Sequence, residues 1–299
     1  MTTCLPLRAA VATTFALALG AGALRAQSTM DSTFAVGRGA RLSVQNISGR
    51  VEVRSWNRAQ IRVLAEYEQA RVEFDANPNQ VTVRTVTRRG NSEVDYRISV
   101  PAGTAVEING ISVDTDISGV CGSLNVNTVS GDVQLSCLEG EGQIQTVSGD
   151  VTVTDARGAL EINATSGEID VRGARSSVTA HSVSGDVSLA DVSGNDVDVE
   201  TVSGDVQYAG RILDNGRYRL AAHSGDVTLH VTGSFNATVS VSTFSGDFAS
   251  DFPIELQPGA RVSREWEFRQ GSGSARVRLN SFSGTINLRR GTATAPREE

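Results

Sequence analysis

Hydrophobic and polar residues alternate in short stretches along most of the chain, and the same stretch returns around one marker. The marker is Ser-Gly-Asp, and its serines are Ser130, Ser148, Ser184, Ser203, Ser224 and Ser245. Ser166-Gly167-Glu168 fills the gap in this series, and Ser283-Gly284-Thr285 follows it. Successive serines are 18, 18, 18, 19, 21, 21 and 38 residues apart. The chain is therefore predicted to repeat every 18–21 residues, with two repeats in the last interval.

Aliphatic residues hold fixed positions relative to the repeat serine. They stand six and four residues before it, as Leu124 and Val126 do, and three and five residues after it, as Val133 and Leu135 do. Alternation with period two predicts strands, and strand pairs that cannot bury an apolar face alone can do so by stacking. We therefore expect an all-β fold: a β-solenoid, similar to a parallel β-helix, with one repeat in each rung. The alternative is an antiparallel β-sandwich, which does not require one motif to recur in register.

The repeats are predicted to span residues 109–250, between two caps. In residues 27–108 one stretch, 41–53, fits the template before the register is lost. This region is predicted to be a β-rich N-terminal cap, with further strands expected at 61–67, 81–87 and 94–100. Residues 251–290 should hold the C-terminal rungs and a cap, followed by a flexible tail at 291–299. Caps are expected because an open solenoid edge would pair with other chains.

The first 26 residues have the features of a secretory signal peptide. Arg8 precedes an apolar stretch, Ala9–Leu24, that is short and contains glycine. We expect cleavage after Ala26, with cleavage after Ala23 as the alternative. No later apolar run is long enough for a membrane-spanning helix. The mature chain is thus expected to be exported and to be periplasmic, associated with the outer surface, or extracellular.

The array of strand, Ser-Gly-Asp and strand is preceded by Tyr-Arg-Ile-Ser-Val-Pro-Ala-Gly at residues 96–103. This combination resembles a bacterial family of unknown function known as putative adhesins or β-strand-repeat proteins. The resemblance covers about residues 33–290. It implies a β-solenoid in an exported or envelope-associated protein, and it carries no catalytic residues over to this chain.

Charge narrows the range of functions. The 299 residues have a formal net charge of −7, and residues 110–250 hold 19 acids against six Arg. Such an acidic chain is not expected to bind nucleic acid. The motif acids should form a line along one edge of the solenoid: Asp132, Asp150, Glu168, Asp186, Asp205, Asp226 and Asp247.

Two roles are open for this line of acids. The aspartates are candidate ligands for a divalent cation such as calcium. Alternatively they serve the turn, where glycine takes a positive φ and Ser or Asp bonds to the backbone. The second role is favoured because the calcium-binding nonapeptide repeat is absent, so no cofactor is assigned. Acids on adjacent rungs could also act as a glycosidase pair, but no rung stands out from the others, and an enzyme is not expected.

Other polar residues give weaker signals. His223 shares a column with Val129 and Val147 and is predicted to be a partly buried core residue, while His181 should point outward and His230 should lie near a corner. Hydroxyl pairs such as Thr128 with Ser130 are reminiscent of the flat faces that bind ice or glycans.

Cys121 and Cys137 are the only cysteines of the mature chain. They should lie near one corner on adjacent rungs, so in an oxidising compartment a disulfide is predicted, with two free thiols as the alternative.

Taken together, these patterns predict a non-catalytic binding or structural module, adhesin-like, at the bacterial cell envelope. Its partner would be an envelope or surface ligand, either a glycan or a protein. The alternative function is a β-helical carbohydrate-active enzyme that uses Asp pairs from adjacent rungs.

Overall fold

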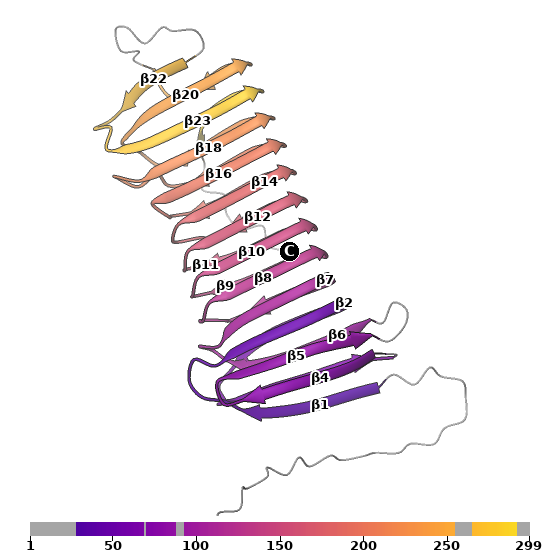
Figure 1. Ribbon diagram of the computed structural model, residues 1–299. Coiled ribbons are helices and arrows are strands. Elements are labelled where there is room, and N and C mark those ends of the chain that lie inside the picture. The colour runs from indigo at the N-terminus through magenta and orange to yellow at the C-terminus, as the bar shows by residue number, and fades with distance from the viewer. Residues whose placement is uncertain (1–27, 69, 88–92, 255–264, 292–299) are drawn as a thin grey trace, which may run out of the picture.

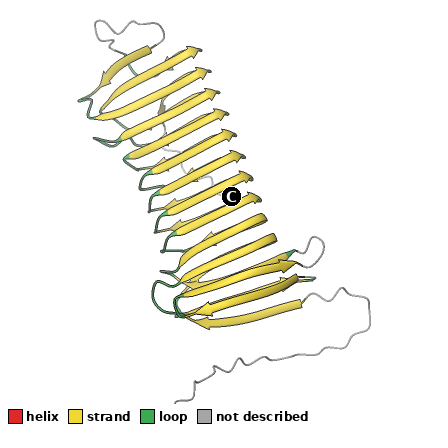
Figure 2. Cartoon of the chain, viewed as in Figure 1, coloured by secondary structure: helices red, strands yellow, loops and turns green. Residues whose placement is uncertain are grey.

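The computed structural model describes residues 28–68, 70–87, 93–254 and 265–291. Within these residues the chain forms 24 strands and no helix, as Figure 2 shows. The strands stack into a long two-sheet solenoid, in which each repeat adds one strand to each sheet (Figure 1). The predicted signal peptide at residues 1–26 lies outside the described residues, as does nearly all of the predicted tail.

The first sheet holds the strands that precede each Ser-Gly-Asp corner. Its strands run parallel except for one antiparallel strand at each end. In spatial order they are β4 (Ala70–Asn77), β5 (Gln80–Thr87), β2 (Arg41–Trp56), β7 (Ala105–Ser118), β8 (Leu124–Ser130), β10 (Gly142–Ser148), β12 (Leu160–Ser166), β14 (Val178–Ser184), β16 (Asp196–Ser203), β18 (Arg217–Ser224), β23 (Ala275–Ser283), β20 (Ala237–Ser245) and β22 (Glu265–Gln270).

The second sheet holds the strands that follow the corner. The long strands β2 and β7 cross the corner and belong to both sheets. In spatial order the second sheet contains β1 (Ser28–Ala35), β3 (Gln60–Tyr67), β6 (Val94–Pro101), the second halves of β2 and β7, β9 (Val133–Leu138), β11 (Val151–Ala156), β13 (Ile169–Arg172), β15 (Val187–Val192), β17 (Val206–Gly210), β19 (Val227–Thr232), β24 (Ile286–Gly291) and β21 (Phe248–Ser250).

Equivalent residues of successive repeats lie directly above one another, which confirms the predicted solenoid. Val133 pairs with Val151, Val151 with Ile169, and Ile169 with Val187. All four side chains are buried between the two sheets. Each buried aliphatic side chain stabilises the fold by about 1.5–3 kcal/mol before conformational entropy is subtracted. The repeated aliphatic columns therefore form one continuous core along the solenoid.

The N-terminal end is closed by strands from residues 28–101. The strands expected near 61–67, 81–87 and 94–100 are present as β3, β5 and β6, while β1 and β4 were not foreseen. A buried hydrogen-bonded group joins the two sheets here. Tyr96 Oη and Thr85 Oγ1 are 2.7 Å apart, and Thr85 Oγ1 donates to Asn46 Oδ1 at 2.9 Å. Burial raises the pKa of Tyr96 to about 12.

Chain order and stacking order differ at the C-terminal end. The last repeat, β23 and β24, is inserted between β18/β19 and β20/β21 instead of following them, as Figure 1 shows for β18, β23 and β20. The interval of 38 residues before Ser283 therefore does not hold two consecutive rungs. It contains β21, the masked segment 255–264 and β22, which pairs antiparallel with β20.

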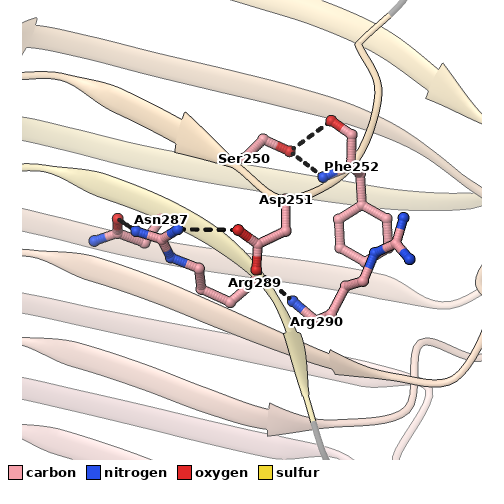
Figure 3. Close-up of polar contacts among 6 residues, drawn as sticks. All are labelled: Ser250, Asp251, Phe252, Asn287, Arg289 and Arg290. Carbon is pink, nitrogen blue, oxygen red and sulfur yellow. Dashed lines mark hydrogen bonds and ion pairs between the residues drawn. The ribbon is translucent and has the colours of Figure 1, made fainter.

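A cluster of polar contacts ties β21 to β24 (Figure 3). Arg289 Nη1 donates to Asp251 Oδ1 at 3.0 Å, and the backbone N–H of Arg290 donates to Asp251 Oδ2 at 3.1 Å. The Arg290 guanidinium also lies over the Phe252 ring, 5.1 Å from its centroid. These donors lower the pKa of the Asp251 carboxyl. Aromatic residues fill the end of the core, where Phe248 packs against Trp266 and Phe268.

Candidate functional site

The predicted acidic line exists, and its side chains bond to the backbone of the next rung. Asp132 Oδ1 accepts the backbone N–H of Asp150 at 3.0 Å, and Asp150 Oδ1 accepts that of Glu168 at 2.9 Å. The same bond recurs farther along, from Asp205 to Asp186 and from Asp226 to Asp205, each at 2.8 Å. We call this row the aspartate ladder. Its regularity gives each carboxylate a structural task at the turn.

The glycine of the motif is required twice over. Gly185 has a φ of +145°, which side chains other than glycine rarely adopt. A Cβ at this position would lie 2.0 Å from the carbonyl oxygen of Gly167 on the preceding rung. The corner thus brings backbone against backbone, and Ser-Gly-Asp is the sequence that permits this close stacking. One rung escapes the pattern, because Val113 replaces the glycine in β7.

No metal centre is evident at the aspartate ladder. Within the described part of the chain, no three His, Cys, Asp or Glu side chains converge in a way that could hold a metal ion. The candidate ligands Asp132, Asp150, Asp186, Asp205, Asp226 and Asp247 are instead spread along one edge, one per rung.

The two cysteines are free and exposed in the structure, so the predicted disulfide is not formed here. The reason is their register. Ser118 pairs with Ser136, and the N–H of Glu139 donates to the carbonyl of Val120 at 3.1 Å. Cys121 is therefore level with Glu139, and Cys137 lies two positions earlier on its rung. A hydrogen bond to Glu139 raises the pKa of the Cys121 thiol, so this cysteine is not an activated nucleophile.

The column that precedes the repeat serine is exposed, which corrects the prediction for His223. We call this column the apolar stripe. Its large hydrophobic members are between 46% and 64% exposed: Ile111, Val129, Val147, Val183, Val202, Phe244 and Phe282. Residues six, four and two positions before the serine point inward, so strand alternation turns the residue one position before it outward. His223 belongs to this column and is exposed.

Three rings of the apolar stripe stack at the C-terminal end of the solenoid. The Phe244 and Phe282 ring centroids are 4.8 Å apart with planes 4° from parallel. His223 continues the stack, 4.7 Å from Phe282. The register of β18, β23 and β20 places these residues on neighbouring rungs. The stripe thus changes from aliphatic to aromatic along the solenoid axis.

A polar column runs beside the apolar stripe on the same outer face of the first sheet. It consists of the residues three positions before the repeat serine, among them Asn109, Asn127, Gln145 and Asn163. By contrast, the hydroxyl residues two positions before the serine are buried, as Thr128 and Thr201 are. The predicted flat face of paired hydroxyls therefore does not form. Sequence reasoning missed the polar and apolar columns as a surface because it treated the valines as core.

Comparisons with known proteins agree with this architecture. A putative adhesin from Parabacteroides distasonis has 11% identity and a TM-score of 0.32, and the match covers 87% of this chain and 97% of that one. A putative cell adhesion protein from Clostridium sporogenes has 10% identity and a TM-score of 0.21, covering 88% and 100%. A putative adhesin from Parabacteroides merdae has 9% identity and a TM-score of 0.26, covering 87% and 95%.

Among curated proteins, none matches the sequence. In the described residues, no helix is long and apolar enough to cross a membrane. One family model matches twice, over residues 36–190 and 175–289, and so covers nearly the whole solenoid with its caps. The chain therefore belongs to the Toastrack DUF4097 family.

Proposed function

We propose that the protein is a non-catalytic, adhesin-like binding module of the bacterial cell envelope, whose rigid solenoid presents the outer face of the first sheet to a surface ligand. The apolar stripe carries this proposal. Val129, Val147 and Phe244 remain in water, where they contribute little to folding. A run of exposed apolar side chains along one line is typical of an interaction surface.

The alternative, a carbohydrate-active enzyme with Asp pairs from adjacent rungs, has less support. Catalytic carboxylates need different surroundings so that one donates a proton while the other stays ionised. Members of the aspartate ladder share one environment, because Asp132, Asp150, Asp186 and Asp205 all accept a backbone N–H from the next rung. Nothing sets one pair of these acids apart.

A binding experiment combined with a turnover assay tests the proposal. The mature chain is incubated with bacterial envelope fractions and with soluble polysaccharides, and bound protein and released reducing ends are both measured. We expect saturable binding to the envelope without release of reducing ends. Release of reducing ends that disappears in Asp150→Asn would contradict the proposal and favour the enzyme.

Export is part of the same proposal and has its own test. The predicted signal peptide is expected to be removed, so the mature protein should begin after Ala26 or Ala23. Fractionation of producing cells, with N-terminal sequencing, measures this directly. An uncleaved chain found only in the cytoplasm would contradict an envelope role.

A further inference from the structure

A shallow gutter runs along the outer face of the first sheet, between the polar column and the apolar stripe. Over β7, β8, β10 and β12 it forms a hollow of about 410 Å³, with Asn127 and Gln145 on one side and Val129 and Val147 on the other. Over β16, β18, β23 and β20 a second hollow of about 520 Å³ has the same two walls. Both hollows belong to one track parallel to the solenoid axis.

The amide wall of the gutter is held in place by its own hydrogen bonds. Asn127 Nδ2 donates to Asn109 Oδ1 at 3.1 Å and to Asn125 Oδ1 at 3.0 Å. Asn163 Nδ2 donates to Glu161 Oε1 at 3.1 Å. The carbonyl oxygens of Asn127 and Asn163 have no hydrogen-bond donor among the described side chains. These bonds orient a row of acceptors along the gutter before any ligand arrives.

The gutter is neutral although the solenoid is strongly acidic. No residue that lines the first hollow is ionisable, whereas residues 110–250 carry a net charge of −13 from 19 acids and six Arg. The second hollow adds only Glu200 and His223. A cationic polymer would be drawn to the acids outside the gutter, and an anionic polymer or a second copy of this chain would be repelled. The charge distribution therefore favours a neutral occupant.

We propose that the gutter binds a neutral polysaccharide chain that lies along the solenoid axis, an inference that rests on the proposed binding function. Sugar hydroxyls would donate to the amide oxygens of Asn127 and Asn163, and the C–H faces of the rings would pack against Val129 and Val147. Rungs are about 4.8 Å apart, close to the length of one pyranose unit, so successive sugars meet equivalent side chains. An extended polypeptide rises about 3.3 Å per residue and would lose this register.

The aromatic end of the stripe supplies the larger contact surface. Phe244 is 64% exposed and Phe282 is 48% exposed, and both line the second hollow. Aromatic side chains offer more apolar contact area than valine at a low cost in side-chain entropy. Binding should therefore weaken more when Phe244 and Phe282 are replaced by serine than when two valines of the stripe are.

The experiment measures binding of the mature chain to an array of neutral oligosaccharides of increasing length, beside anionic oligosaccharides and a cationic amphipathic peptide. We expect affinity for at least one neutral series to increase with chain length. The double variant Val129→Asp/Val147→Asp should bind that series at least about tenfold more weakly. The control is Gln134→Asp/Thr152→Asp, which changes exposed residues of the same rungs on the second sheet and should bind like the parent.

The outcomes separate this inference from the proposed function. Preference for the cationic peptide or the anionic sugars, a dimer in sedimentation experiments that the stripe variant abolishes, or equal loss of binding in both double variants would overturn the gutter assignment. Envelope binding without affinity for any neutral sugar would overturn the inference and leave the proposed function in place. Absence of envelope binding would overturn the proposed function itself. Circular dichroism of each variant confirms that the fold is kept.

Discussion

Replacing one motif glycine by alanine tests whether close stacking of the corners holds the solenoid together. In Gly185→Ala the new Cβ would lie 2.0 Å from the carbonyl oxygen of Gly167 and 2.8 Å from its carbonyl carbon. Contacts below 3.0 Å are not tolerated, so two rungs must move apart. We expect about 1–3 kcal/mol from the positive φ and a similar cost from overpacking. The total loss of stability is then about 3–5 kcal/mol.

Gly233→Ala is the matched control, because Gly233 also has a positive φ, +84°, but its added Cβ would meet nothing within 4 Å. This variant should cost only about 1–2 kcal/mol, the backbone contribution. Urea unfolding followed by circular dichroism gives the two stabilities, and hydrogen exchange of β14 and β15 reports the local effect if unfolding is not two-state. If Gly185→Ala were no more destabilising than Gly233→Ala, contact between stacked corners would not limit this sequence.

Three further predictions follow from single contacts. Because the folded pKa of Tyr96 is about 12 against about 10 in a model phenol, its neutral form contributes fully below pH 10, and the contribution of about 2.7 kcal/mol is lost as the pH rises to 12. Tyr96→Phe should flatten the decrease in unfolding free energy between these pH values, and an unchanged slope would contradict this. Asp150→Ala should cost about 0.5–1.5 kcal/mol, since it removes the acceptor for a backbone N–H on the next rung; a melting experiment showing no loss would refute a structural role for the ladder. Thiol titration of the native protein should find both Cys121 and Cys137 free, with Cys121 reacting more slowly because its pKa is raised; an absence of free thiols would restore the disulfide.

The sequence determined the fold because its evidence is local and repeated. Val133, Val151, Ile169 and Val187 occupy one position of the repeat, and the structure places them in one ladder. Period-two alternation fixes which side of a strand faces the core, and the constant interval between serines fixes the stacking register. The preference for turn chemistry in the motif acids has the same origin, since a residue required in every rung serves what every rung has in common.

Only the tertiary structure decided where the pattern stops describing the core. Val129 and its equivalents are apolar and strictly repeated, so the sequence alone groups them with buried residues, yet the sheet turns them outward. The position of β23 and β24 within the stack was equally hidden, because identical rungs can pair in any order and the spacing of serines does not record which neighbour each rung meets. Whether a repeated valine supports the core or lines a gutter depends on which face of its strand is covered, and that is a property of the assembled sheets.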